Sequence, residues 1–156
     1  MKKFILAIAL VFASSAFAMS ASAACPDFAG QYLCKDNKGT HDLVVRQGYQ
    51  NGQMVYVFAS PTDKIEVVTD GTVRSFPNGN GLKDGRYVAV CKSNHIDANI
   101  EAILVDERNH PYGTVKVNML FSRDDARELI THSVGNAYVQ GKTYPVDTTE
   151  TCTFKR

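Results

Sequence analysis

Few residues of this 156-residue chain have the type and spacing that catalysis requires. Neither a G-x-S-x-G nor an H-E-x-x-H motif is present, and the four histidines are not spaced as a pair of metal ligands. The histidines are His41, His95, His110 and His132. The sequence therefore predicts no catalytic centre, and we expect the protein to be neither an enzyme nor the carrier of a metal or organic cofactor.

The four cysteines could in principle bind a metal or form disulfides. They are Cys25, Cys34, Cys91 and Cys152. No two of them lie at the interval of two to four residues that structural zinc sites use. An even number of cysteines in an exported chain instead favours two disulfide bonds.

The spacing of the cysteines limits how they can pair. If residues 28–35 form a strand, Cys25 and Cys34 stand about 30 Å apart, whereas bonded cysteines have Cα atoms within about 7 Å. Two connectivities remain. We favour Cys34 with Cys152 and Cys25 with Cys91, because the last strand of an even-stranded barrel lies beside the first. A bond between residues so far apart contributes on the order of 4–5 kcal/mol in the chain-entropy treatment.

The first 23 residues have the pattern of an export signal. Lys2 and Lys3 precede an apolar run at residues 4–12, and Ala21 and Ala23 fit the rule for a cleavage site. The run is shorter than a membrane span of about 20 residues. We therefore expect a signal peptide at residues 1–23, a single domain at residues 24–156, and a periplasmic or secreted protein. A lipid anchor on Cys25 is the less favoured alternative, because it would leave one cysteine unpaired.

The charge of the chain limits its partners. Lys2 and Lys3 are two of its 17 basic residues, so the mature chain has 15 against 16 acidic ones. A nearly neutral chain without basic runs is not typical of a nucleic-acid-binding protein. We expect a monomer that binds a small molecule or a secreted protein.

Tyrosines are the remaining candidates for a binding site. Tyr32, Tyr56 and Tyr87 all fall within predicted strands, where each could pack in the core or face a ligand. The segment 77–85 is rich in glycine and proline and must be a loop. Its Asn78 and Asp84 could offer oxygen atoms to calcium, but the glutamate that calcium loops use is absent.

The clearest structural element is a hairpin at residues 95–121. Ile96, Ala98 and Ile100 alternate with polar residues, and Val115 and Val117 continue this period of two after a turn. Such alternation is typical of strands with one buried face. Asp97, Asn99, Glu101, Lys116 and Asn118 are expected on the solvent side.

Further strands follow from the same pattern and from turn residues. Asn51-Gly52 predicts a tight hairpin, and Asp70-Gly71 predicts a second one between strands at residues 64–69 and 72–76. Residues 123–134 could form the one helix or a strand, with strand favoured, and residues 138–145 a loop or short strand. The other expected strands are residues 28–35, 40–49, 54–59, 86–92 and 148–156.

Eight to ten short strands joined by short turns define an all-β, antiparallel meander. Closing such a sheet on itself removes its exposed edges, so we expect an up-and-down barrel, with an antiparallel β-sandwich as the alternative.

Two resemblances to known families follow from these residues. Gly30-Gln31-Tyr32, together with the basic Lys155 or Arg156 near the end, resembles the G-x-W opening and basic last strand of lipocalin and calycin barrels. This resemblance implies a barrel that binds a small apolar molecule. Tyr32-Leu33-Cys34, followed by a valine-rich strand and by the late Cys152, is similar to the periplasmic inhibitors of c-type lysozyme, although their serine-rich inhibitory loop has no match.

The sequence thus leads to two expectations for function. The first is an exported barrel that binds a small apolar ligand, with Tyr32, Tyr56 and Tyr87 as candidate lining residues. The alternative is a protein-binding module, such as an inhibitor of a secreted enzyme, or a structural protein of the cell envelope.

Overall fold

The computed structural model describes residues 25–36 and 39–155, which form one antiparallel sheet of ten strands and contain no helix. The strands are β1 (Gly30–Asp36), β2 (Gly39–Gln50), β3 (Gln53–Ala59), β4 (Lys64–Val68), β5 (Arg74–Ser75), β6 (Leu82–Lys92), β7 (His95–Val105), β8 (Pro111–Arg123), β9 (Leu129–Val139) and β10 (Lys142–Phe154). The expected all-β meander is confirmed. The expected signal peptide, residues 1–23, lies outside the described residues.

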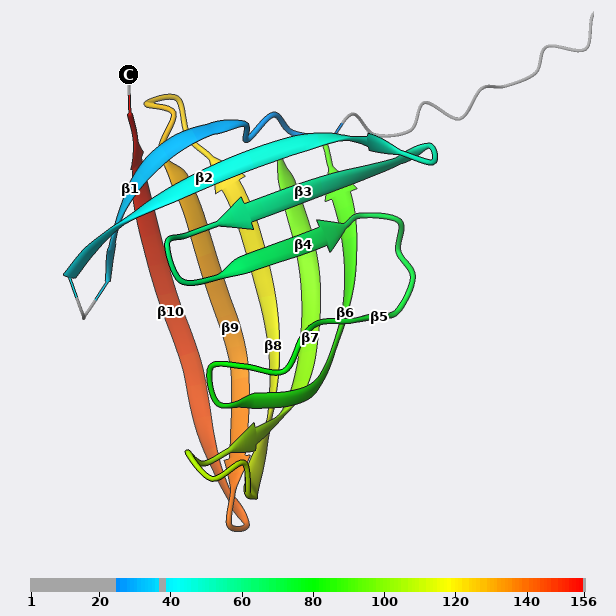
Figure 1. Cartoon of the computed structure of the whole chain (residues 1–156), viewed down its shortest axis with the longest axis vertical. Helices are drawn as coiled ribbons and strands as arrows, with labels where there is room; N and C mark the ends of the chain where they lie inside the picture. The colour runs from blue at the N-terminus through cyan, green and yellow to red at the C-terminus, as the bar shows by residue number, and fades with distance from the viewer. Residues whose placement is uncertain (1–24, 37–38, 156) are drawn as a thin grey trace, which may run out of the picture.

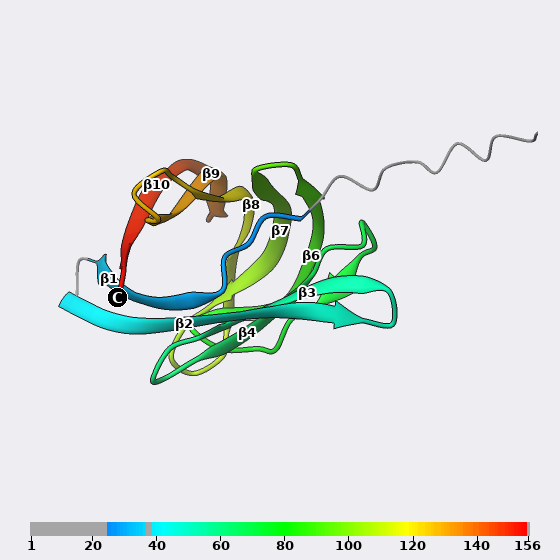
Figure 2. The ribbon, with the colours of Figure 1, turned by 90° about the horizontal axis from the view of Figure 1, so that it is seen from above.

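The sheet is a strongly curled half-barrel. Its strands are ordered β4-β3-β2-β1-β10-β9-β8-β7-β6-β5, so β4 and β5 are the two edges. Strands β1–β4 cross in front of the upper part of the longer strands β6–β10 (Figure 1). Seen from above, the two groups curve around a common interior (Figure 2). The long strands continue below β4, where the segment around β5 and the start of β6 crosses in front of them (Figure 1).

The hairpin expected at residues 95–121 is β7 and β8, which pair in the register Ile96 with Phe121 and Ile100 with Val117. Ile96 and Ala98 are buried, whereas the alternate residues face the opposite side of the sheet. The pattern of the sequence therefore identified both the pairing and the buried face. We call the face that carries Ile96 the inner face of the sheet.

The core fills the upper part of the half-barrel. Phe28, Tyr32, Tyr56, Ile96 and Leu129 are completely or almost completely buried there. Aromatic rings from both groups of strands are in contact: the ring centroids of Phe28 and Tyr56 lie 5.7 Å apart. These contacts attach β2 and β3 to the long strands behind them.

A glycine marks the bend of the long strands. A Cβ atom on Gly135 in β9 would lie 2.1 Å from the Lys116 carbonyl oxygen of β8. Only glycine fits this approach of two backbones, which lets the sheet curve sharply.

Both disulfides have the favoured pairing. Cys34 and Cys152 are directly opposite each other in the pair β1–β10, and both are buried. Cys25 and Cys91 join the segment before β1 to β6. Each bond therefore connects one half of the meander to the other.

The predicted hairpin at Asp70-Gly71 is wrong, because β4 and β5 lie at opposite edges of the sheet. The Asp70 carboxylate accepts hydrogen bonds from the Thr72 amide at 3.0 Å and from its hydroxyl at 2.8 Å. The Gly71 N–H donates to the Ala89 carbonyl oxygen of β6 at 2.9 Å. These bonds carry the chain across the gap between the edges instead of folding it back.

Other segments are more regular than expected. Residues 123–134 form no helix: β8 ends at Arg123 and β9 begins at Leu129. Residues 138–145 belong to the hairpin of β9 and β10, where Gln140 and Gly141 have positive φ angles of 49° and 75°. The predicted loop 77–85 is partly strand, since β6 begins at Leu82 and has an irregularity before Arg86.

Replacing both Cys34 and Cys152 by alanine should lower the free energy of unfolding by about 3–5 kcal/mol, because the bond closes a loop of 118 residues. Urea unfolding measures the change. Removing Cys25 and Cys91, 66 residues apart, should cost about 0.5 kcal/mol less in the same treatment. A loss below about 1 kcal/mol in the first variant would contradict the role given to this bond.

Candidate functional site

Two of the three candidate tyrosines are bound within the core. The Tyr32 hydroxyl donates to the Phe28 carbonyl oxygen at 2.8 Å, and the Tyr56 hydroxyl donates to the Pro26 carbonyl oxygen at 2.6 Å. Burial raises the pKa of both phenols above the usual value. Both side chains hold the segment before β1 against the top of the half-barrel, and neither hydroxyl points to an open surface.

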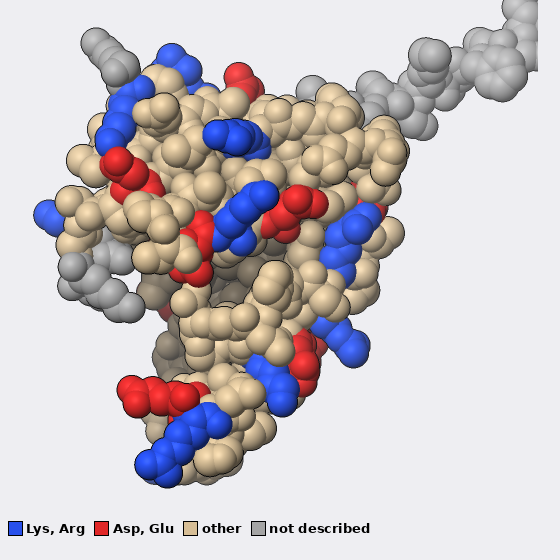
Figure 3. All heavy atoms as spheres, in the orientation of Figure 1, with Lys and Arg blue, Asp and Glu red and all other residues tan. Residues whose placement is uncertain are grey.

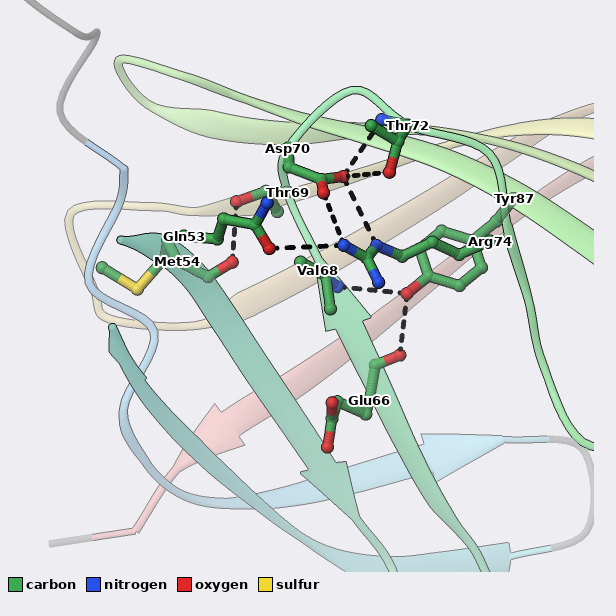
Figure 4. Close-up of polar contacts among 9 residues, drawn as sticks. All are labelled: Gln53, Met54, Glu66, Val68, Thr69, Asp70, Thr72, Arg74 and Tyr87. Atoms are coloured by element: carbon green, nitrogen blue, oxygen red, sulfur yellow. Dashed lines mark hydrogen bonds and ion pairs between the residues drawn. The ribbon is translucent and has the colours of Figure 1, made fainter. Parts of the chain in front are cut away.

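The third candidate, Tyr87, connects the two sides of the half-barrel. Its hydroxyl accepts a hydrogen bond from the Val68 amide at 3.1 Å and donates to the Glu66 carbonyl oxygen at 3.3 Å, so it binds the free backbone edge of β4 (Figure 4). Tyr87 itself belongs to β6. A side chain here takes the place of the backbone ladder that would close a full barrel.

An ion pair fixes the same region, which we call the seam: residues 66–74 together with Tyr87. The Arg74 guanidinium donates to Asp70 Oδ2 at 2.5 Å and to Gln53 Oε1 at 3.3 Å (Figure 4). The Asp70 side chain is only 7% exposed. The hydrogen bond from Arg74, followed by that from the Thr72 amide, holds the pKa of Asp70 well below its usual value. The Asp70 carboxylate and the Arg74 guanidinium therefore hold the segment that joins the two edges of the half-barrel.

Below the seam the inner face is open. The space-filling view shows a recess between the part that carries β2–β4 and the segment around β5 and the start of β6 (Figure 3). The inward-facing residues of β8–β10 at this level are only half-buried: Val115, Val117, Ser133, Ala137 and Val146. We call this open part of the inner face the hollow.

A glutamate and a histidine approach each other at the upper border of the hollow. Glu150 is two residues before Cys152 on β10, and His41 is opposite Cys34 in the pair β1–β2, so both lie on the inner face. Their closest atoms, Glu150 Oε1 and His41 Nε2, are 3.9 Å apart. Cys34 is near both, but its sulfur is in a disulfide and cannot bind a metal. Two ligands do not make a structural metal site.

The remaining candidates lie apart from the hollow. His132 and His110 form exposed local pairs with Asp147 and Asp106, at 3.0 and 3.4 Å. In the glycine-rich loop, the Asn78 side-chain oxygen accepts the Asp84 amide at 2.9 Å. That bond uses one of the oxygen atoms that calcium would need.

The outer face carries two grooves, of about 480 and 440 Å³. The larger crosses β6, β7 and β8, and its walls include Arg86, Glu101, Lys116, Asn99 and Asn118. Lys116 Nζ lies 2.8 Å from Glu101 Oε1, so two of these charges neutralise each other. Asn99, Glu101, Lys116 and Asn118 are four of the five residues that the sequence placed on the solvent side.

The residues that carry the lipocalin resemblance lie at the pairing of β1 with β10. Phe154 packs on Gly30, and its ring lies 5.5 Å from the Tyr32 ring, edge to face. The Arg127 guanidinium lies 4.0 Å from the centroid of the Phe154 ring. Lys155 instead pairs with Asp42.

The fold defines a disulfide-bonded, all-β protein built on one curled antiparallel meander. Comparison of the chain with family profiles, curated proteins and solved structures gives no match. None of the described residues forms a helix that could cross a membrane. Its two disulfides point to a non-reducing, exported environment.

Glu150 is the residue that sequence reasoning missed. Its position two residues before a buried cysteine puts it on the same face of the strand as that cysteine, because strand side chains alternate. This signal was available in the sequence. Its importance depends on the register of β10 with β9 and β1, which the sequence did not determine.

Replacing Tyr87 by phenylalanine should lower the free energy of unfolding by about 1–3 kcal/mol, because it leaves the buried Val68 amide without an acceptor. Hydrogen exchange at the Val68 amide should accelerate. Tyr112→Phe, which removes the hydroxyl of an exposed tyrosine, is the matched control. Unchanged stability and exchange in Tyr87→Phe would show that the seam does not depend on this hydroxyl.

The Asp70 ion pair should make stability sensitive to acid. Because the folded-state pKa of Asp70 is lowered, its contribution is complete above the unfolded pKa of about 3.9 and is lost as the pH falls below that value. Asp70→Asn should therefore be less stable than the wild type at pH 6, and the difference should shrink by pH 3. Asp125→Asn, in the exposed β8–β9 turn, is the control. Thermal unfolding between pH 3 and 6 tests this; a constant difference argues against it.

Proposed function

We propose that the protein is an exported binding protein and that the hollow is its site for a small, largely apolar molecule. The incomplete burial of inward-facing apolar side chains carries this proposal. Val117 and Val146 occupy positions that a closed barrel would bury, yet they are only partly buried. A ligand that covered them would remove apolar surface from water, which contributes about 25 cal/mol per Å².

The shape of the hollow supports the same proposal. Small residues lie between the valines, with Gly135 beside Val117 and Val146, and Ala137 beside Val115. They leave space above the sheet where larger side chains would fill the interior. The buried aromatic side chains lie above, in the core, so a ligand need not displace them. Tyr144, at the lower end of the inner face of β10, is 49% exposed.

The order of the strands explains why this part is open. Only β4, which has five residues, and the two-residue β5 form the edges of the sheet. Strands β8 and β10 have 13 residues each and extend beyond the seam. The uncovered length of the long strands forms the floor of the hollow.

Recognition of another protein is the second candidate function, and the edge strand β4 favours it. Tyr87 occupies the edge groups of Glu66 and Val68. The open part of this edge is therefore the start of β4, where the inward-facing Ile65 is 52% exposed. An exposed edge strand can pair with an extended segment of another chain. An inhibitor of a secreted enzyme would belong to this class.

A fluorescence titration with N-phenyl-1-naphthylamine, a neutral apolar probe, tests the first proposal. The wild type should bind the probe, and Thr148→Trp should weaken binding at least about tenfold, because the indole would occupy the inner face. Thr149→Trp is the matched control, since the adjacent residue on β10 points to the outer face. Circular dichroism confirms that both variants fold.

Absence of probe binding in the wild type, or equal loss in the two tryptophan variants, would contradict a site in the hollow. Native mass spectrometry of protein taken from its own exported fraction adds a second test. A small-molecule adduct supports the binding proposal, whereas a co-purifying protein that is lost in Ile65→Lys supports the second candidate.

A further inference from the structure

We infer that the ligand of the hollow is an amphipathic molecule with a cationic amine head group, and that Glu150 binds this head group. The inference rests on the proposed function and specifies the class of ligand. It follows from how polar and apolar side chains are distributed along the inner face of β8–β10, and from the position of the one carboxylate there.

The polar side chains lie directly below the buried disulfide. Glu150 is opposite Thr131, and Thr148 is opposite Ser133, in consecutive inward-facing positions of β10 and β9. These four side chains form a polar patch at the upper end of the hollow. Their hydroxyl groups can donate or accept hydrogen bonds, so they suit the polar part of a ligand.

The apolar side chains lie at the next positions down the same strands. Val146 and Val117 flank Gly135, and Val115 is opposite Ala137. From Glu150 to the inward-facing Tyr144 is six residues of β10, or about 20 Å at ~3.4 Å per residue. On β9 and β10 the lining therefore changes once, from polar to apolar, over the length of a single extended ligand. On β8 the inward-facing residues at both levels are apolar, because Phe121 and Met119 are opposite Thr131 and Ser133.

Glu150 is the acidic residue of the polar patch. Among the inward-facing described residues of β8, β9 and β10, it is the only acidic one. The basic residues of this face lie outside the patch: Arg123 at the top donates to the Asp27 carbonyl oxygen, and Lys142 is at the bottom hairpin. A cation near Glu150 would therefore meet a carboxylate without a neighbouring lysine or arginine on these strands.

The Glu150 carboxylate also has oxygen atoms that can accept hydrogen bonds from a ligand. His41 Nε2 is 3.9 Å from Glu150 Oε1, which is beyond hydrogen-bond distance, and 40% of the Glu150 side chain is exposed. Its oxygens can accept the N–H groups of an ammonium ion. Charge-assisted bonds of this kind are about twice as strong as neutral ones.

Isothermal titration calorimetry with three ligands of equal chain length tests the inference. The ligands are dodecylamine as the cation, dodecanol as the neutral compound and dodecanoate as the anion, each below the concentration at which it aggregates. The wild type should bind dodecylamine about tenfold more tightly than dodecanol and should bind dodecanoate most weakly. Glu150→Gln should remove this order while it continues to bind dodecanol.

Asp147→Asn is the matched control, because it removes one negative charge from the outer face of the same strand. It should keep the preference for the amine. Equal affinity for the three compounds in the wild type, or an unchanged preference in Glu150→Gln, would overturn the inference and leave the proposed function standing. Failure of all three to bind would overturn both.

Discussion

The pairing of β1 with β10 is the interaction on which the rest of the structure depends. Among the described residues, the pair β1–β10 is the only ladder between the meanders β1–β4 and β5–β10, so without it the two would be joined through side chains and the segment between β4 and β5. The Cys34–Cys152 bond lies within this ladder, so it fixes which residues are opposite each other. That register sets the inner face of both halves, and with it the positions of His41 and Glu150.

A sheet that begins and ends with short strands cannot close through backbone hydrogen bonds alone. The seam solves this with side chains: Tyr87 satisfies the edge of β4, and the Asp70–Arg74 pair holds the crossing segment. This closure reaches only as far as the short edge strands. The same constraint therefore gives a packed core above the seam and an open hollow below it.

The sequence predicted most of the fold because its main features are local. Alternation at Ile96, Ala98 and Ile100 identified the hairpin of β7 and β8. The length of the first strand excluded a bond between Cys25 and Cys34, and the expected contact of the first strand with the last favoured the pairing that the structure has. The Asp70-Gly71 hairpin was wrong because the carboxylate binds forward to Thr72 and Arg74, a contact that residue type alone does not reveal. The role of Tyr87 depends on β4 and β6, which meet only in the folded sheet. The same holds for the approach of His41 to Glu150, since it requires the register of three strands.

The openness of the half-barrel and the charge of Glu150 are physically linked. A carboxylate on the inner face of a closed barrel would lose its hydration, which costs several kcal/mol unless a close partner compensates. Glu150 has no hydrogen-bonded cation among the described residues, yet water reaches it because the hollow is open. Its oxygens can therefore exchange water for a cationic group when one enters. An inner face that has both apolar side chains and a hydrated charge is unfavourable as a core, but it suits a site that must be occupied and vacated.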